Sequence, residues 1–321
     1  MEASVLLNLL LLAIGIFLLL KGANYLIDGS IALAKRLGVS ELFIGLTIVA
    51  FGTSAPELAV SIQAAVKGSG IAIGNVLGSN IANVALVLGA SALIRNIKVS
   101  KSTMRSEIPF VILISLATGV LLLNDGFVIS RYEGIVLLCF FIIFIDYVYG
   151  MAKKDIFNKE TVVESKVENI LEKNIALAWL ATLGGMAGVV FGGEMVVKSG
   201  IVLAKTFGVS ETLIGVTVVA VGTSLPELVT SIVAGIKKQA DLAVGNIVGS
   251  NIFNLLVVLG ISSLVSPIKA DRPVTQDIIF TIATVTILPF LAGKKRTLGR
   301  FSGVILLAIY VLYLCMSVIA K

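Results

Sequence analysis

One stretch of this sequence occurs twice, and each copy carries a glutamate inside an otherwise apolar segment. Residues 38–66 reappear as residues 208–236 with 18 of 29 aligned residues identical, and Glu57 and Glu227 occupy matching places. A charged side chain at the centre of a membrane span costs about 2.5 to 3.5 kcal/mol on insertion scales. Because this costly group occurs in both copies, we expect the two glutamates to share one polar pocket at the interface between the copies.

The composition indicates a membrane protein with many spans. Hydrophobic residues make up 57% of the chain and charged residues only 14%, which lies outside the range of soluble domains. A span needs about 20 apolar residues, and the hydrophobic runs predict ten helices. We place them at residues 3–34, 40–66, 71–94, 106–124, 129–150, 174–204, 210–236, 242–265, 274–292 and 298–319.

The predicted helices divide into two halves that are joined by a charged segment. The first repeat covers residues 1–149, the linker residues 150–173 and the second repeat residues 174–321. Because each half contains five spans, the second half must enter the membrane from the opposite side. The predicted fold class is therefore an all-α membrane protein with ten transmembrane helices in two inverted five-helix repeats.

Basic residues between the predicted spans set the orientation. With the N-terminus outside, most lysines and arginines lie on the cytoplasmic side, as the positive-inside rule requires. We therefore predict a multi-pass protein of the cell membrane with both termini extracellular and the linker cytoplasmic. The net charge of +6 does not come from a basic stripe mixed with aromatic residues, so no nucleic acid partner is expected.

Each glutamate directly follows a proline that disturbs its helix. Pro56 cannot donate a hydrogen bond, and its ring clashes with the carbonyl four residues back, so the helix is predicted to break around Gly52 and Thr53. Pro226 predicts the same break in the second copy. Backbone carbonyl groups released by such a break must be buried in protein or line a cavity, where they can coordinate a cation.

Hydroxyl groups lie on the same helix face as each glutamate. Thr53, Ser54 and Ser61 are three or four residues from Glu57, so their side chains share its face. The matching residues around Glu227 are Thr223, Ser224 and Ser231. Calcium takes about 6 to 8 oxygen ligands, and two glutamates would neutralise one Ca²⁺. In the alternative interpretation, the prolines only kink two helices and the hydroxyls bond to their own backbone, which leaves both glutamates unexplained.

A second polar motif follows each glutamate. Asn75, Ser79 and Asn83 are spaced by four and share one helix face. The matching residues of the second copy are Asn246, Ser250 and Asn254. Gly74 and Gly78 form a small-xxx-small pattern that favours close helix packing. Packing explains these glycines but not the polar residues, so we expect the polar line to face the glutamates.

Further charges lie in the long first and sixth predicted helices. We interpret Lys21, Asp28, Glu194 and Lys198 as residues that snorkel to the membrane surface or pair with one another, with an ion path as the alternative. Trp179, near the start of the sixth span, is interpreted as an anchor at the membrane interface.

The two motifs resemble the alpha repeats of the cation/calcium antiporter superfamily, and among its branches the prokaryotic sodium/calcium exchangers are closest. The similarity rests on residues 52–57 with 74–83 in the first half and on residues 222–227 with 245–254 in the second. It implies a secondary active antiporter that exchanges Ca²⁺ for Na⁺ by alternating access, without a chemical step and without a cofactor. The implied partners are the lipid bilayer and the transported cations, and the implied functional unit is a monomer.

The resemblance also implies a set of ligands for each ion. Glu57 and Glu227 would hold Ca²⁺ together with the backbone carbonyls of Thr53 and Thr223. Asn83 and Asn254 would complete the centre. Two sodium sites would flank it, one formed by Ala50, Thr53, Ser54, Glu227 and Ser250, and the other by Ala220, Thr223, Ser224, Glu57 and Ser79.

Other functions remain open at this point. The same two glutamates could take up protons as Ca²⁺ leaves, which would make the protein an H⁺/Ca²⁺ antiporter. The complete oxygen sets beside each glutamate favour Na⁺, because Na⁺ needs several ligands and a proton needs one. A channel and an intramembrane hydrolase are less consistent with inverted five-span copies and with glutamates flanked by hydroxyl groups. For the antiporter we expect the long first and sixth helices to slide against the other eight.

Overall fold

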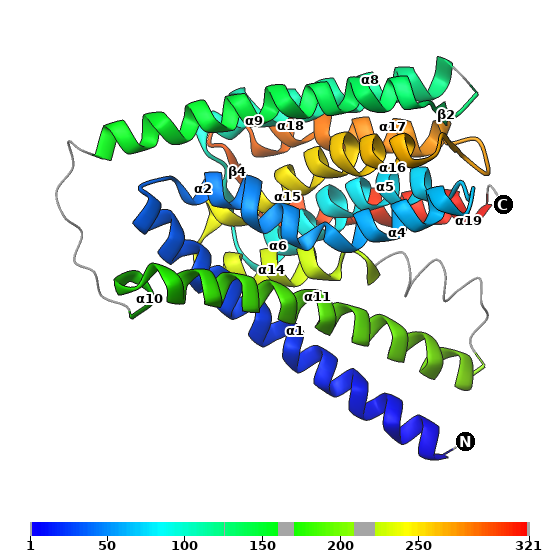
Figure 1. The fold of residues 1–321 in the computed structure, drawn as a ribbon, viewed down its shortest axis with the longest axis horizontal. Helices are drawn as coiled ribbons and strands as arrows, with labels where there is room; N and C mark the ends of the chain where they lie inside the picture. The colour runs from blue at the N-terminus through cyan, green and yellow to red at the C-terminus, as the bar shows by residue number, and fades with distance from the viewer. Residues whose placement is uncertain (1, 125, 160–169, 209–221, 320–321) are drawn as a thin grey trace.

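The computed structural model describes residues 2–124, 126–159, 170–208 and 222–319, and these form a bundle of helices (Figure 1). The first helices are α1 (Glu2–Leu37), α2 (Glu41–Ile44), η1 (Gly45–Val49), α3 (Ala50–Thr53), α4 (Ala55–Val66), α5 (Ile71–Ile81), η2 (Ala82–Leu88), α6 (Gly89–Ile94), α7 (Lys101–Arg105), α8 (Glu107–Asn124) and α9 (Arg131–Lys159). They are followed by α10 (Ile170–Lys173), α11 (Ile175–Thr206), α14 (Leu225–Ile236), α15 (Ala240–Phe253), η4 (Asn254–Val258), α16 (Leu259–Val265), α17 (Thr275–Thr286), α18 (Leu288–Ala292) and α19 (Arg300–Ile319). The label η marks π-helical turns, a form often found at functional sites.

The described helices agree with nine of the ten predicted spans. Eight of them are long and apolar enough to cross a membrane, and the run from α2 to α4 gives a ninth that is bent by 45°. The seventh predicted span, residues 210–236, is described only from residue 222 onward, where it contains the short apolar helix α14. The count of ten therefore stays a prediction. α9 continues to Lys159, so helix extends into the segment that the sequence predicts as linker.

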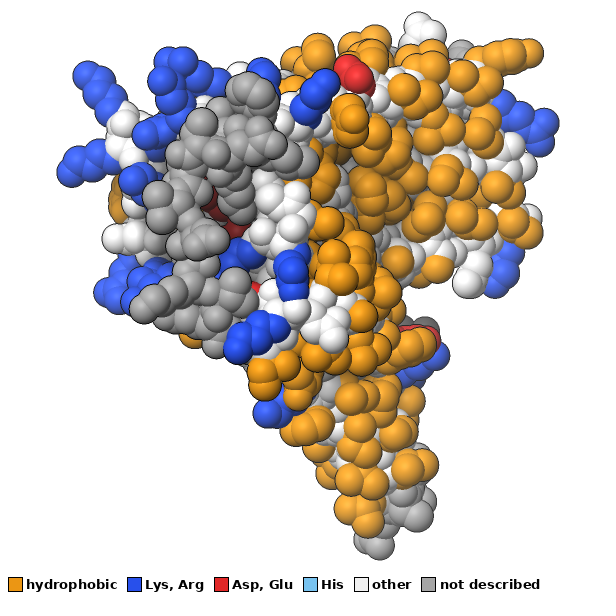
Figure 2. Space-filling view, turned by 60° about the vertical axis from the view of Figure 1, so that its left-hand side comes forward, with side chains coloured by type: hydrophobic (Ala, Val, Ile, Leu, Met, Phe, Trp, Pro, Cys, Tyr) orange, Lys and Arg blue, Asp and Glu red, His pale blue; other side chains and the backbone are white. Residues whose placement is uncertain are grey.

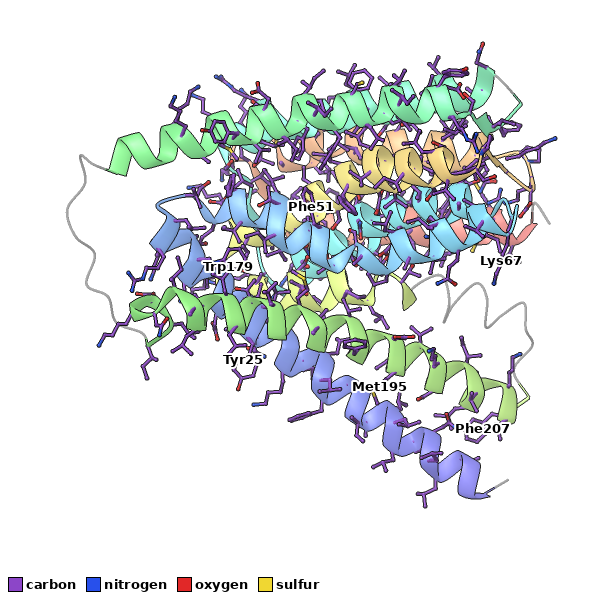
Figure 3. All side chains as sticks on the ribbon, viewed as in Figure 1. Tyr25, Phe51, Lys67, Trp179, Met195 and Phe207 are labelled. Atoms are coloured by element: carbon purple, nitrogen blue, oxygen red, sulfur yellow. The ribbon has the colours of Figure 1, made fainter. Side chains whose placement is uncertain are left out.

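Hydrophobic side chains cover the body of the molecule and the arm that projects from it (Figure 2). Lysine and arginine side chains gather at the ends of the body and are sparse between them. This distribution is the one expected of a protein whose apolar belt lies in hydrocarbon and whose charged ends lie in water. Trp179 lies near the α10 end of α11 (Figure 3) and is 36% exposed, as an interfacial anchor would be.

Two short antiparallel ribbons join loops from the two halves of the chain. β1 (Ile97–Lys98) pairs with β4 (Thr297–Leu298), and β2 (Val128–Ile129) pairs with β3 (Ile268–Lys269). In β1 and β3 the isoleucine is buried and the lysine is exposed. These ribbons tie the helices of one half to those of the other.

The centre of the bundle is formed by the duplicated motifs. α15 packs against α2, η1, α3 and α14, while α4 packs against α5. Nearly all of α15 is buried, whereas much of α11 and the first half of α1 are exposed. The polar motifs are therefore enclosed by protein, and the apolar helices around them face the lipid.

Two of the charges in the long helices pair as predicted and one does not. Glu194 and Lys198 form an ion pair at 2.6 Å along α11. Asp28 pairs instead with Lys237 at 2.7 Å, a residue at the end of α14 that no local pattern connects with α1. This bond ties the first long helix to the second copy of the motif.

α1 and α11 lie side by side, and their backbones come unusually close (Figure 1). A Cβ atom built on Gly22 would lie 2.6 Å from the Val189 nitrogen and 2.7 Å from the Gly185 oxygen. Both contacts are with backbone atoms, which cannot turn away as a side chain can. Glycine at position 22 therefore allows the two helices to pack as one unit.

We expect Gly22→Ala to weaken the packing of α1 on α11 by about 1 to 3 kcal/mol, because the added methyl group meets backbone that cannot yield. The measurement is thermal unfolding in detergent, followed by the fluorescence of Trp179, the only tryptophan of the chain. The matched control is Gly184→Ala, since a Cβ at Gly184 has nothing within 4 Å. Equal midpoints for the two variants would contradict this account of the helix pair.

Candidate cation-binding site

The helix that carries Glu57 is broken directly before it. α3 ends at Thr53, Ser54 has φ −89° and ψ 6°, and α4 begins at Ala55 with Pro56 in its first turn. Proline has no N–H group, so the carbonyl four residues earlier in the chain loses its helical partner. The second copy repeats this geometry, since Ser224 has φ −88° and ψ 6° before α14 begins. The predicted breaks are present in both copies.

Both glutamates are fully buried, and each accepts side-chain hydrogen bonds on one oxygen only. Glu227 Oε1 accepts from Ser54 Oγ at 2.9 Å and from Ser250 Oγ at 3.4 Å. Glu57 Oε1 accepts from Ser79 Oγ at 3.5 Å. Ser54, three residues before Glu57, contacts Glu227 directly, so the segment that carries one acid lies against the other acid. The structure therefore brings the two predicted acids together in the interior.

The first predicted sodium-binding set forms one continuous network. Besides its bond to Glu227, Ser250 Oγ donates to the Ala50 carbonyl at 3.4 Å and lies 3.4 Å from Thr53 Oγ1. Thr53 Oγ1 also lies 3.3 Å from the same Ala50 carbonyl. Since Ser54 donates to Glu227, all five residues of this set are linked although they come from both halves of the chain.

The second predicted sodium-binding set has fewer hydrogen bonds among the described residues. Ser79 reaches Glu57, but the buried Ser224 Oγ makes no hydrogen bond within the described residues. Thr223 is partly buried, and Ala220 lies outside the described residues. The two sets have similar sequences but different hydrogen bonding in this structure.

Two further predicted residues, Asn75 and Asn246, hold the motif helices together. Asn75 Nδ2 donates to Ser61 Oγ at 3.2 Å, and Asn246 Nδ2 donates to Ser231 Oγ at 3.1 Å. Each copy therefore uses the same bond between its two motif helices. Asn246 Oδ1 also accepts from Thr53 Oγ1 at 3.1 Å, which connects it to the first set.

Two asparagines that sequence reasoning missed, Asn80 and Asn251, cross-link the copies. Asn80 Nδ2 donates to the Asn251 carbonyl at 3.2 Å, and Asn251 Nδ2 donates to the Asn80 carbonyl at 3.4 Å. Their side-chain oxygens accept from Asn254 Nδ2 and Asn83 Nδ2 respectively, each at 3.1 Å. Both lie inside the second polar motif. The available signal was a fourth polar residue in each copy, which lies off the line of polar residues spaced by four.

This cross-link fixes which atom Asn83 and Asn254 leave free. A backbone carbonyl only accepts hydrogen bonds, so Asn80 and Asn251 must present their amide nitrogens to it and their oxygens to the neighbouring asparagine. That neighbour must then donate with its own nitrogen. Asn83 Oδ1 and Asn254 Oδ1 are consequently left without a partner among the described residues, and both residues are fully buried.

The result is a group of buried oxygen atoms that lack hydrogen-bond donors. They are Glu57 Oε2, Glu227 Oε2, Asn83 Oδ1, Asn254 Oδ1 and Ser224 Oγ. Burying carboxylates without a positive partner is strongly unfavourable. An all-oxygen donor set suits a hard cation such as Ca²⁺ or Na⁺. The described residues contain no cluster of three or more His, Cys, Asp or Glu side chains, which agrees with ligands drawn from amide, hydroxyl and carbonyl groups beside two carboxylates.

Comparison with known proteins places this chain in a family. The model of the sodium/calcium exchanger protein family matches residues 7–150 and 177–319. The putative antiporter CaxA of Alkalimonas amylolytica is 38% identical over 94% of this chain and 95% of its own length. The sodium/calcium exchanger MaX1 of Methanosarcina acetivorans is 33% identical over 96% of this chain and 97% of its own.

A comparison with a solved structure leads to the same family. The sodium/calcium exchanger from Methanococcus jannaschii superimposes with a TM-score of 0.83 and 30% identity, covering 97% of this chain and 98% of that one. The similarity extends over both halves of the chain and over the fold as a whole. The chain therefore belongs to the sodium/calcium exchanger protein family, whose members are membrane transporters and not enzymes.

Proposed function

We propose that this protein is a secondary active antiporter that exchanges Ca²⁺ for Na⁺ across a membrane. The observation that carries the proposal is the pair of buried carboxyl groups, Glu57 and Glu227, each with one oxygen that no described residue satisfies. In an apolar interior these oxygens need a positive partner. A cation that arrives from one side and leaves on the other supplies it. The names of the full-length relatives, an exchanger and a putative antiporter, support the same function.

In this proposal Ca²⁺ binds at the centre, between the two copies of the motif. Glu57 and Glu227 supply the charge, the carbonyls of Thr53 and Thr223 supply backbone ligands, and the partnerless amide oxygens of the two cross-linked asparagines complete the shell. Those asparagines are Asn83 and Asn254. Two carboxylates neutralise one Ca²⁺, and the remaining ligands replace water without adding charge.

Na⁺ binds on either side of this centre and uses the same glutamates. The first set, built around Ser54 and Glu227, is already assembled by hydrogen bonds, so its oxygens lie within reach of one small ion. The second set, which includes Ser224, completes the symmetry. Because each glutamate belongs to both a sodium set and the calcium set, Na⁺ and Ca²⁺ compete, and exchange follows from that competition.

Alternating access requires a part that moves relative to the site. We assign this role to α1 and α11, which pack closely on each other and lie outside the central helices. The architecture proposed for it has ten spans in two inverted repeats, residues 1–149 and 174–321, with residues 150–173 as a cytoplasmic linker. Both termini are extracellular and the monomer is the working unit. The helix pair slides readily only when the buried charge is compensated by bound ions.

Glu57→Gln should abolish Ca²⁺ transport while the protein stays folded, because the amide cannot compensate the charge of a divalent ion. The measurement is radiolabelled Ca²⁺ uptake into proteoliposomes under an outward Na⁺ gradient, with uptake expected at the background of empty vesicles. The matched control is Asp146→Asn, an exposed acid on α9, which should transport normally. Robust exchange by Glu57→Gln would exclude the assignment of Glu57.

Ser54→Ala should raise the Na⁺ concentration for half-maximal Ca²⁺ exchange about tenfold, the equivalent of about 1.4 kcal/mol, because it removes one oxygen of the first sodium set. The Ca²⁺ dependence should change less, since Ser54 is not in the calcium set. Ser115→Ala, which removes a buried hydroxyl on α8, should change neither.

The same assay separates Na⁺ from H⁺ as the coupling ion. With Na⁺ coupling, a pH gradient without Na⁺ drives no Ca²⁺ uptake. Uptake driven by pH alone, together with an unchanged ion dependence in Ser54→Ala, would instead establish an H⁺/Ca²⁺ antiporter that uses the same two glutamates.

A further inference from the structure

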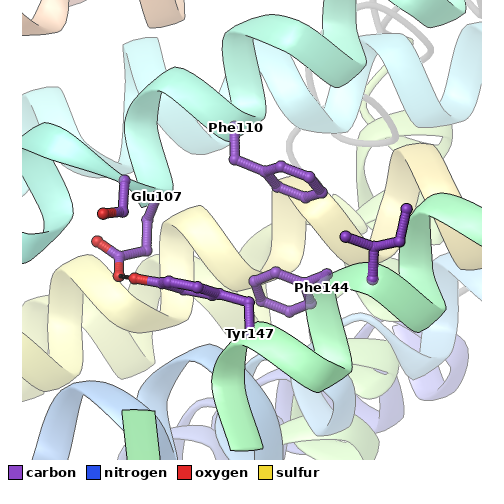
Figure 4. A pocket seen from close by; sticks show the side chains of 6 residues that line it. Glu107, Phe110, Phe144 and Tyr147 are labelled. Atoms are coloured by element: carbon purple, nitrogen blue, oxygen red, sulfur yellow. Dashed lines mark hydrogen bonds between the residues drawn. The ribbon is translucent and has the colours of Figure 1, made fainter. Parts of the chain in front are cut away.

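A pocket with a mostly apolar lining is found between α8 and α9, and none of its lining residues belongs to the cation site (Figure 4). Its cavity has a volume of about 200 Å³. The lining residues are Ser106, Glu107, Phe110, Ile143, Phe144 and Tyr147. Three aromatic residues thus line this small space together with one acidic residue, whose carboxyl group is buried at its edge.

The carboxyl group of Glu107 is buried and only half satisfied. The residue is 1% exposed. Its Oε1 accepts a hydrogen bond from the Tyr147 hydroxyl and another from Ser102 Oγ at 3.2 Å. Its Oε2 has no partner, and within the described part of the chain no lysine or arginine forms an ion pair with it. An acid buried in this way needs a positive group.

The second half of the chain contains the same arrangement. Residues 101–110 align with residues 271–280, which places Asp277 at the position of Glu107. Asp277 Oδ1 accepts a hydrogen bond of 2.7 Å from the Tyr313 hydroxyl, as Glu107 does from Tyr147. Aromatic rings surround both pairs, with Phe280 5.3 Å from Tyr313 and Phe110 5.7 Å from Phe144 between ring centroids.

In both copies one carboxyl oxygen, Glu107 Oε2 or Asp277 Oδ2, has no partner among the described residues, and the copies differ in the positive partner of the other oxygen. Arg272 Nη2 lies 2.9 Å from Asp277 Oδ1. The residue aligned with Arg272 in the first half is Ser102, whose short side chain brings no charge. The second copy thus contains its own cation, while the first copy has a cavity beside the matching acid.

From this comparison we propose that the pocket at Glu107 binds the ammonium group of an organic amine, presented by an aminophospholipid headgroup or by a free amine. The ammonium group would pair with the Glu107 carboxyl group, as Arg272 pairs with the Asp277 carboxyl group through Oδ1, and it would give the partnerless Oε2 a donor. The rings of Phe110, Phe144 and Tyr147 line the pocket and attract a cation over their faces. The cavity is several times the volume of one water molecule, about 30 Å³, so it has room for a small headgroup.

The position of the pocket favours a lipid as the source of the amine. Ile143 is 59% exposed and Tyr147 37% exposed on the outer face of α9, so the cavity borders the apolar surface. Arg105, two residues before Glu107, is exposed at the end of α7, where it suits the phosphate of a zwitterionic headgroup. Ca²⁺ does not fit here, because one carboxylate among aromatic rings cannot supply its about 6 to 8 oxygen ligands.

The proposal is tested by thermal unfolding of the purified protein in detergent, titrated with phosphatidylethanolamine, phosphatidylcholine or free ethanolamine. Phosphatidylethanolamine should raise the unfolding midpoint, and phosphatidylcholine should not, because its quaternary ammonium has no N–H to donate. Stabilisation by free ethanolamine at comparable concentration would assign the site to soluble amines; stabilisation by the lipid only would assign it to the membrane.

Two variants test the role of the Glu107 carboxyl group in different ways. Glu107→Gln removes the charge, and Ser102→Arg supplies the internal guanidinium that the second copy has. Each should weaken the amine effect about tenfold or more, the equivalent of losing a hydrogen bond between charged groups. Asp146→Asn removes a neighbouring exposed charge outside the pocket and should respond like the native protein.

Three results would overturn the proposal. One is the absence of stabilisation by every amine. Another is equal stabilisation by phosphatidylethanolamine and phosphatidylcholine, which would indicate that acyl chains fill the pocket. The third is an unchanged amine response in both Glu107→Gln and Ser102→Arg, which would show that the carboxyl group takes no part.

Discussion

Two carboxyl groups enclosed in an apolar bundle are the constraint on which this structure depends. Glu57 and Glu227 have no exposed surface, and the described residues place no lysine or arginine against them. Such groups are tolerated only if they are hydrogen-bonded and their charge is compensated, and a bound cation would supply that charge in the function proposed above. The helix breaks before each proline, the hydroxyl groups around Ser54 and the burial of α15 are all consistent with that requirement. The helices outside the centre then need only be apolar and closely packed.

The asparagine cross-link shows how the chain prepares oxygen ligands without further acids. Asn80 and Asn251 use both their nitrogen and oxygen atoms in bonds between the copies. Those bonds use the nitrogens of Asn83 and Asn254 and leave their oxygens free. An amide that could rotate freely would present its donor as often as its acceptor. Fixing the amide therefore presents an acceptor and not a donor, as the proposed cation site requires.

Patterns within short stretches of sequence predicted the helical spans and the helix break, which depend mainly on neighbouring residues. Hydrophobic runs located nine of the described spans, and Pro56 predicted a break around Gly52 and Thr53, directly before the one observed at Ser54. The ribbons, the Asp28–Lys237 pair and the Asn80–Asn251 cross-link join residues from opposite halves of the chain, and no spacing within one helix reveals them. The π-helical turns were also missed, since η2 and η4 continue α5 and α15 directly and their sequences do not differ from ordinary helix. The pairing of Glu107 with Tyr147 joins two helices that each look like a plain span.

The two copies of the motif are related in sequence yet differ in their hydrogen bonds among the described residues, and this difference is consistent with the shared centre proposed above. Ser54 donates to Glu227, whereas Ser224, its counterpart, has no partner among the described residues. In the proposed arrangement each glutamate belongs to one sodium set and to the calcium set, so a carboxyl group that closes its sodium set is drawn away from the shared centre. An exchanger needs such a difference between its two sets, because an ion site that is closed equally toward both sides of the membrane would release no ion. Away from the centre the copies are free to diverge in sequence as well, as Ser102 and Arg272 have done. A duplicated chain can thus keep one shared ion site and give its two peripheral acids different partners.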